Sequence, residues 1–138
     1  MSRVIIAAAV VAVAALVAWW ASRRTADAPT RPDNWTVPAQ LDRGDFAASD
    51  ASWLVVVFSS ATCDTCRLVV AKAEALASSH VAVQEVEYGA HRALHERYGI
   101  DAVPTTVIAD HEGIVRGSFV GPVTAADLWA AVAEARNE

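Results

Sequence analysis

The sequence predicts an α/β fold, with a central mixed sheet flanked by helices, after one N-terminal transmembrane helix. Three observations lead to this fold class. Valine-rich apolar runs alternate with segments in which apolar residues recur at helical spacing. The last two apolar runs are separated by a four-residue turn, which adds an antiparallel hairpin to the sheet. A long apolar run without a charged residue lies near the start of the chain.

The uncharged run, residues 4–21, predicts a transmembrane anchor. Its eighteen apolar residues, at about 1.5 Å per helical residue, nearly cross a bilayer core of roughly 30 Å. The alternative is a secretory signal peptide, whose apolar region usually covers only about 7 to 15 residues. The run is longer than that, and it ends in Trp19 and Trp20, which suit a membrane interface. These features favour the anchor.

Arginines on either side of the run predict the orientation of this single-pass anchor in a cell membrane. Arg3 precedes the run, whereas Arg23, Arg24 and Arg31 follow it. Because cytoplasmic flanks carry the excess of Lys and Arg, these residues favour the cytoplasmic side for the soluble domain. The difference is small, so the sequence leaves the side of the membrane open.

Residues 22–40 are a predicted linker, and residues 41–138 are a predicted folded domain. The linker contains three of the five prolines and has no hydrophobic periodicity. Residues 33–138 carry fifteen acidic side chains and seven Lys or Arg, a net charge of −8. Because nucleic-acid binding requires a basic surface, we expect no nucleic-acid partner.

The first half of the domain predicts a strand, a helix and a second strand. The run from Trp53 to Ser60, "WLVVVFSS", is continuous and valine-rich, which is typical of a central strand covered on both faces. Residues 63–79 then predict a helix. Its apolar stripe consists of Cys66, Val69, Val70, Ala73, Leu76 and Ala77. The segment "VAVQEVEY" from Val81 predicts the second strand.

The second half of the domain predicts a short helix, a hairpin and a closing helix. The helix "AHRALHERYG" starts at Ala90, and the strand "PTTVIAD" starts at Pro104. A turn at residues 110–113 leads into the strand "IVRGSFV". Residues 124–136 open with a partial capping box and predict the last helix. We expect this helix to bury Leu128, Trp129 and Val132.

Two cysteines, Cys63 and Cys66, lie at the start of the first predicted helix of the domain. Such a pair is compatible with a redox site, half of a zinc site or a static disulfide. Zinc needs about four ligands, and His91 and His95 are spaced so that they could complete a set. However, His91 follows Cys66 after a gap of twenty-four residues, which exceeds the zinc-finger spacing of about 12 to 15. We therefore expect no metal, and both histidines on a solvated helix face.

The positions of the two cysteines predict unequal roles. Cys63 lies at the N-terminal end of the helix, where free N–H groups and the helix dipole favour a thiolate. Cys66 lies on the apolar stripe of the same helix. Cys63 is therefore the predicted nucleophile, and Cys66 is the predicted resolving thiol. Asp64 opposes the effect of the helix, because a neighbouring carboxylate raises the pKa of a thiol.

Three features resemble the thioredoxin family: the order of the predicted elements, the Cys-x-x-Cys directly after the central strand, and the "VPT" of residues 103–105. The resemblance covers nearly all of residues 41–136. It implies a thioredoxin-like fold and a thiol-disulfide oxidoreductase that exchanges disulfides with protein thiols. It also implies that Cys63 and Cys66 form a redox-active disulfide, with no cofactor besides these cysteines.

The same resemblance implies a substrate-binding surface beside the cysteine pair. Val103 and Pro104 would form a wall that contacts the substrate chain, and the peptide bond between them would be cis. Thr62 stands where similar thioredoxins usually carry a tryptophan, and we assign it to the same surface. Asp64 and Thr65 replace the usual Gly-Pro between the cysteines.

Val57 is the main departure from the family pattern. Similar thioredoxins bury an acid six residues before the first cysteine, where it accepts the proton of the resolving thiol, and this chain has valine there. Glu85 or Glu87 of the next predicted strand is a candidate substitute. The departure supports an alternative function, a non-catalytic membrane-tethered thioredoxin-fold binding module with a static disulfide. The sequence leaves open whether exchange would reduce or oxidise a substrate.

Overall fold

The computed structural model describes residues 10–17 and 35–137. The chain divides between Pro32 and Asp33 into two units, which are described separately. In the first unit, residues 10–17 are helical and exposed. The rest of the predicted anchor and most of the predicted linker lie outside the described residues. Among the described residues, no helix is long and apolar enough to cross a membrane.

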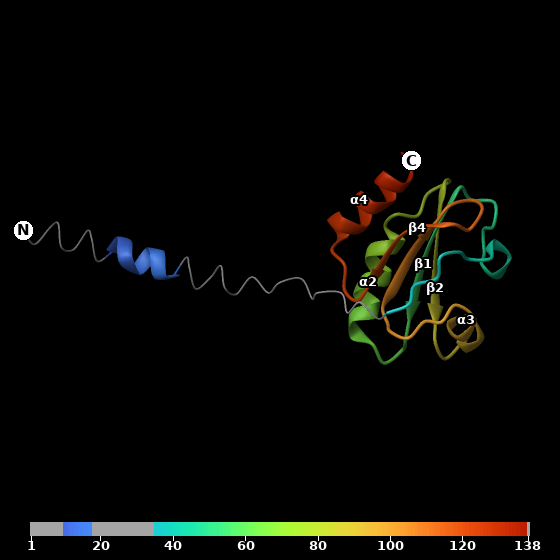
Figure 1. Cartoon of the computed structure of the whole chain (residues 1–138), viewed down its shortest axis with the longest axis horizontal. Coiled ribbons are helices and arrows are strands. Elements are labelled where there is room, and N and C mark those ends of the chain that lie inside the picture. Colours follow the sequence, from blue (N-terminus) through green and yellow to red (C-terminus); the bar gives the residue numbers. More distant parts are fainter. Residues whose placement is uncertain (1–9, 18–34, 138) are drawn as a thin grey trace, which may run out of the picture. The chain divides into compact units, whose positions relative to one another are not determined.

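The second unit, whose helices and strands Figure 1 draws, is built on one four-stranded sheet. The strand order in this sheet is β2-β1-β3-β4. The strands are β1 (Trp53–Ser59), β2 (Val81–Glu87), β3 (Thr105–Ala109) and β4 (Val115–Val120). Strand β1 pairs parallel to β2 and antiparallel to β3, and β4 pairs antiparallel to β3. The predicted mixed sheet and its hairpin are therefore confirmed.

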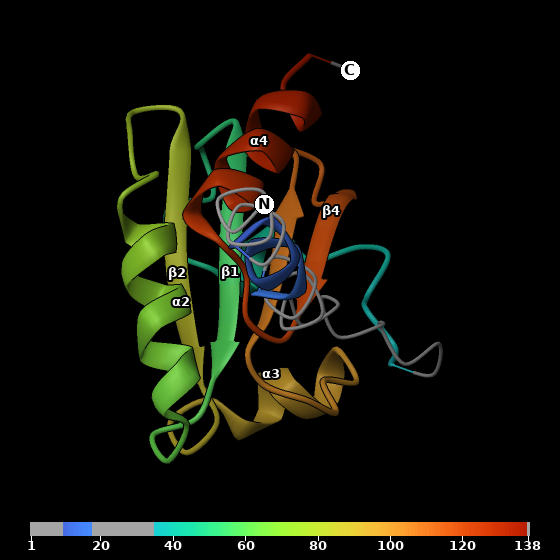
Figure 2. The same cartoon turned by 90° about the vertical axis from the view of Figure 1, so that its left-hand side faces the viewer.

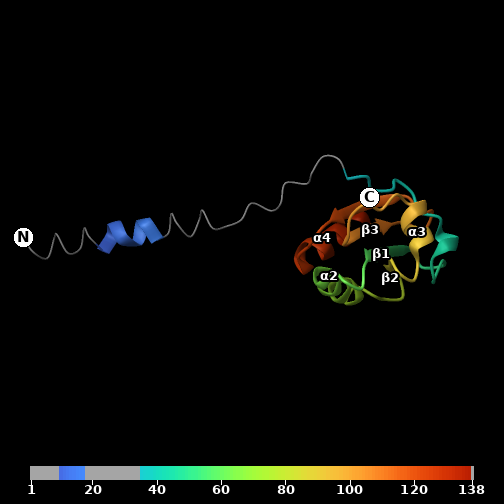
Figure 3. The same cartoon turned by 90° about the horizontal axis from the view of Figure 1, so that it is seen from below.

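Helices cover both faces of this sheet. The elements are α2 (Asp64–Glu74), α3 (Arg92–Arg97), α4 (Ala125–Ala135) and a short 3-10 helix, η1 (Arg43–Asp45). Figure 2 looks onto the face that α2 and α4 cover, and Figure 3 shows α3 on the opposite face. This arrangement of layers is the predicted α/β fold.

Strand β1 lies between two apolar clusters, one on each face of the sheet. Val55 and Val57 pack with residues of α2 and α4, whereas Leu54, Val56 and Phe58 pack against the α3 side. Alternate residues of a strand point to opposite faces, so a strand covered on both faces becomes apolar throughout. All residues from 54 to 59 are buried, as the valine-rich run predicted.

Residues 39–41 pair with the start of β4 outside the hairpin. Gln40 forms an antiparallel bridge with Ile114. The Val115 N–H donates to the Ala39 carbonyl at 3.0 Å. The Leu41 N–H donates to the Gly113 carbonyl at 2.8 Å, and the Leu41 side chain is 1% exposed. The chain is thus already part of the folded unit before residue 41.

Helix α2 ends five residues before the end of the helix that is predicted over residues 63–79. Its last residue is Glu74, and the Leu76 N–H turns back to the Ala73 carbonyl at 2.8 Å. The Ser78 hydroxyl then accepts hydrogen bonds from the N–H groups of His80 and Val81. A serine side chain that satisfies the backbone in this way competes with helix continuation. Residue 77 is consequently exposed.

Trp129 is exposed, which corrects the expectation that α4 buries it. Leu128, Val132 and Ala135 form the buried stripe of this helix, whereas Trp129 is 51% exposed. Successive residues of an α-helix are rotated by about 100°, so the neighbour of a buried residue points to the side of the stripe. The predicted start is confirmed, because the Thr124 hydroxyl accepts the Asp127 N–H at 3.1 Å.

Candidate functional site

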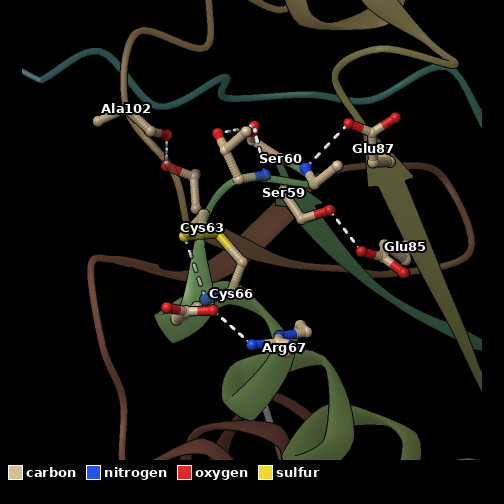
Figure 4. The surroundings of a disulfide bond; sticks show 12 residues. Ser59, Ser60, Cys63, Cys66, Arg67, Glu85, Glu87 and Ala102 are labelled. Atoms are coloured by element: carbon tan, nitrogen blue, oxygen red, sulfur yellow. Dashed lines mark hydrogen bonds and ion pairs between the residues drawn. A yellow bond between two sulfur atoms is a disulfide. The ribbon is translucent and has the colours of Figure 1, made fainter.

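Cys63 and Cys66 lie where the chain leaves β1 and begins α2 (Figure 4). A disulfide joins them, with 5.3 Å between their Cα atoms. Cys63 is the N-cap residue of α2 and has an extended backbone. Its Sγ accepts the Cys66 N–H at 3.1 Å. The sulfur of Cys63 therefore occupies the position at a helix N-terminus where negative charge is stabilised.

The two cysteines differ in burial. Cys66 is 1% exposed and lies on the buried side of α2 with Val69, Val70 and Ala73. Cys63 is only half-buried. Solvent and a partner chain thus reach Cys63 more easily than Cys66. This is the placement on which the predicted roles depend, and the roles themselves stay predictions.

Asp64 and Arg67 form an ion pair in the first turn of α2. Their side chains are 91% and 77% exposed, and exposed ion pairs of this kind contribute little to stability. The pair places a guanidinium beside the carboxylate that was expected to oppose a thiolate at Cys63. The charge of Asp64 is therefore partly compensated within the same turn.

The loop between β1 and Cys63 is a tight turn. The Cys63 N–H donates to the Ser60 carbonyl at 3.0 Å, and the hydroxyls of Ser60 and Thr62 lie 3.2 Å apart. Ala61 and Thr62 are exposed. Thr62 is thus accessible directly before the cysteine pair, where the sequence predicted part of a substrate surface.

The segment around Pro104 is the second part of the predicted substrate surface. The Val103–Pro104 peptide bond is cis, as predicted. Pro104 is buried, whereas Val103 is half-buried. The Thr105 hydroxyl donates to the Ala102 carbonyl at 2.8 Å, and Ala102 is among the residues that surround the disulfide (Figure 4). The structure therefore brings this segment to the cysteine site.

A cleft of about 220 Å³ connects this segment with the loop that precedes Cys63. The residues that line it are Ser60, Tyr88, His95, Ile100, Asp101, Ala102 and Val103. Of these, only Val103 belongs to the predicted substrate surface. Ile100, Asp101 and Ala102 directly precede Val103, whereas the other three residues come from separate stretches of chain that no local pattern groups with it.

His95 is buried, which corrects the expectation that it lies on a solvated helix face. It is 2% exposed, and its Nε2 lies 2.8 Å from the Val86 carbonyl. A carbonyl can only accept, so Nε2 carries the proton. The ring packs edge-on against Phe58 and Tyr88. Within residues 10–17 and 35–137, no group of three His, Cys, Asp or Glu is placed to hold a metal ion.

Two carboxylates of β2 reach the end of β1 and the loop that follows it (Figure 4). Glu85 lies opposite Val57 in the strand register and accepts the Ser59 hydroxyl at 2.5 Å. Glu87 accepts the Ala61 N–H at 3.1 Å. Among the described hydrogen bonds, neither carboxylate contacts a cysteine. The sequence indicates both acids only as candidate proton acceptors, and no local pattern predicts these contacts.

The carboxylate of Glu87 is surrounded by backbone donors. The N–H groups of Gly89, Ala90 and Ala61 lower the pKa of Glu87, in this order of effect. Hydrogen bonds from backbone N–H groups favour the charged form of a carboxylate. Glu87 therefore remains ionised down to a lower pH than an isolated glutamate.

Comparison with known proteins agrees with this architecture. The family model named Thioredoxin matches residues 42–134, which is more than half of the chain. No curated protein matches the chain.

Several solved structures share the fold. A mutant thioredoxin from Halobacterium salinarum has a TM-score of 0.57 at 23% identity, over 71% of this chain and 88% of that chain. Chloroplastic thioredoxin z has a TM-score of 0.59 at 23% identity, over 66% and 84%. Mitochondrial thioredoxin 3 from Saccharomyces cerevisiae has a TM-score of 0.53 at 18% identity, over 62% and 81%. At these identities the similarity establishes the fold alone.

Proposed function

We propose, because the chain belongs to the thioredoxin family, that it is a thiol-disulfide oxidoreductase that exchanges disulfides with protein thiols. The observation that carries the proposal is the disulfide between Cys63 and Cys66 at the N-terminus of α2. One cysteine of the pair is accessible and the other is buried. An accessible sulfur can meet a partner chain, and a buried neighbour can then release that partner.

Exchange would proceed in two steps. The thiolate of Cys63 attacks one sulfur of a substrate disulfide, and the other substrate sulfur leaves as a thiolate. Cys66 then gives up its proton, which the departed substrate thiolate can take, and attacks the Sγ of Cys63. This step forms the Cys63–Cys66 bond and frees the second substrate thiolate, so two electrons pass to the substrate. The same steps in reverse oxidise a substrate dithiol.

The surroundings of Cys63 support its role as the nucleophile. The thiolate is the reactive form of cysteine, and a helix N-terminus stabilises it. The Cys66 N–H already points at the Cys63 sulfur. We assign Thr62, Val103 and Pro104 to the surface that receives the substrate chain, because they come from the two segments that flank the disulfide. No cofactor beyond the cysteines is required for these steps.

We also propose that the protein is held at a cell membrane by a single N-terminal pass. The support is the uncharged run of residues 4–21, together with its aromatic end. Arg23, Arg24 and Arg31 favour the cytoplasmic side for the domain. The partners would then be thiols or disulfides of proteins on that side.

The reduction potential of the cysteine pair tests the proposed activity. The purified protein is equilibrated with glutathione or dithiothreitol buffers, and the oxidised fraction is measured by alkylation and mass. A value between about −120 and −270 mV matches known exchange proteins and supports the proposal. A value well below about −300 mV indicates a static disulfide. The buried Val57, in place of an acid, would then favour the non-catalytic binding module.

A further inference from the structure

We propose that Glu87 is a positioning residue, which holds the loop before Cys63 in place and thereby keeps the Cys63 sulfur at the helix N-terminus. The inference rests on the proposed function, in which Cys63 is the nucleophile. It adds to that function a side chain of β2 that holds the loop before Cys63 in place.

The carboxylate of Glu87 connects two separate backbone segments. Oε1 accepts the Ala61 N–H at 3.1 Å, and Oε2 accepts the Ala90 N–H at 2.9 Å. Ala61 lies two residues before Cys63, and Ala90 lies in the turn after β2. Figure 4 shows Glu87 with its bond to the loop. One side chain thus joins the loop to the end of an edge strand.

The strand end to which the loop is joined is itself well fixed. The Tyr88 N–H donates to the Ser59 carbonyl at 2.9 Å, which continues the pairing of β1 and β2. The His91 N–H donates to the Glu87 carbonyl at 2.9 Å. The backbone at Glu87 and Tyr88 is therefore fixed by two hydrogen bonds, and the Glu87 side chain can hold the loop against this fixed strand end.

The loop has few other constraints. The remaining hydrogen bonds of residues 60–62 are local, among Ser60, Thr62 and Cys63. Within the described part of the chain, Glu87 is the one side chain outside the loop that hydrogen-bonds its residues. If the Glu87 carboxylate were lost, only these local hydrogen bonds would hold the loop in place.

Gly89 offers a way to shift the Glu87 carboxylate without removing its charge. A Cβ atom at residue 89 would lie 3.0 Å from Glu87 Oε2, which is too close for an undisturbed contact. The backbone of Gly89 is not left-handed, so alanine is compatible with its conformation. Gly89→Ala would thus shift the carboxylate by a few tenths of an ångström while leaving its charge in the protein.

A positioning role and a charge effect of Glu87 predict changes of opposite sign in the pKa of Cys63 when the carboxylate is lost. A nearby negative charge raises the pKa of a thiol, so removing the charge alone would lower it. Loosening the loop would instead move Cys63 away from the N-terminus of α2, which raises the pKa. The sign of the change therefore separates the two effects.

The experiment measures alkylation of Cys63 by iodoacetamide across pH, in reduced full-length protein that carries Cys66→Ser. Glu87→Gln and Gly89→Ala are compared with Glu85→Gln, which removes an acid from the same strand but leaves the loop's backbone bonds intact. We expect both test variants to raise the Cys63 pKa and to slow alkylation at pH 7 about two- to fivefold. The control is expected to leave the pKa unchanged or lower.

A lower pKa in Glu87→Gln, with Gly89→Ala unchanged, would show that Glu87 acts through charge and would overturn the proposal. Wild-type values in both variants would overturn it as well. Circular dichroism checks that each variant is folded, and Gly89→Ala decides alone if Glu87→Gln does not fold. The measurement needs no substrate, so a protein that fails to exchange disulfides but shows the expected shifts would contradict only the proposed function.

Discussion

Val57 of β1 lies opposite Glu85 of β2, with the hydroxyl of Ser59 bonded to the Glu85 carboxylate. Val57 is fully buried among apolar side chains of the α2 and α4 face, whereas Glu85 is exposed. The Glu85 carboxylate therefore does not occupy the buried position at which similar thioredoxins carry an acid. An acid introduced at position 57 would therefore lie in an apolar cluster.

Val57→Asp should destabilise the protein strongly at neutral pH. Burial in an apolar cluster disfavours the charged carboxylate and raises its pKa by about 3 units, equivalent to roughly 4 kcal/mol. Because the folded-state pKa would exceed the unfolded value, the loss grows as pH rises from about 4 to 7. Urea unfolding at pH 4.5 and pH 7 measures this difference. Equal losses at both pH values would show that the acid finds a charged partner, with Val57→Asn as the uncharged control.

Cys66→Ser should leave Cys63 covalently joined to substrates. Without Cys66 the mixed disulfide has no internal thiol to attack it, so intermediates accumulate. Cys63→Ser should trap almost nothing, because the remaining cysteine is 1% exposed. Non-reducing electrophoresis of cells that express each variant gives the comparison. Similar trapping by both variants would contradict the proposed order, in which Cys63 attacks first and Cys66 resolves the mixed disulfide.

Asp110 should stabilise the fold in a pH-dependent manner. It is 5% exposed; burial would raise the pKa of its carboxyl. Bonds from Arg116 and from the N–H groups of Ile114 and Glu112 outweigh burial and lower that pKa. The depressed pKa means that this stabilisation is present above the unfolded value near 3.9 and is lost as pH falls through the folded one.

Asp110→Asn should therefore lower the free energy of unfolding by about 1 to 3 kcal/mol at pH 7, because bonds to a charged group are lost. The difference between the variant and the wild type should shrink as the pH approaches 3. Denaturant melts at pH 3, 5 and 7 measure it, and Glu96→Gln is a control on an exposed ion pair. A difference that does not change between pH 3 and pH 7 would exclude the titration of Asp110 as its source.

The uncharged run of residues 4–21 should keep the full-length protein in the membrane fraction after a carbonate wash. An apolar helix of this length resists extraction, unlike a peripherally bound domain. Release by carbonate, or a mature chain that begins after Ala28 by mass spectrometry, would contradict the anchor. Digestion of the domain by protease added outside intact cells would contradict the cytoplasmic side.

Periodicity in the sequence predicts the four strands and the three α-helices of the domain, but neither the end of α2 nor the short helix η1. The run from Trp53 and the stripe that includes Cys66 each follow from one local pattern. Trp129 and His95 were misplaced because hydrophobicity alone does not fix which side of a helix meets the sheet. The bond between Glu87 and Ala61 joins residues twenty-six positions apart, and only the strand register brings them together.

The pairing of residues 39–41 with the start of β4 has a consequence for solubility. The outer edge of a sheet exposes backbone groups that can recruit a second chain, and proteins usually cover such edges. Gln40 and Ala39 provide this cover at the point where β4 begins. A fragment that starts at residue 41 would lose this cover and become more prone to intermolecular strand pairing, whereas a fragment that starts at Trp35 would keep the start of β4 paired.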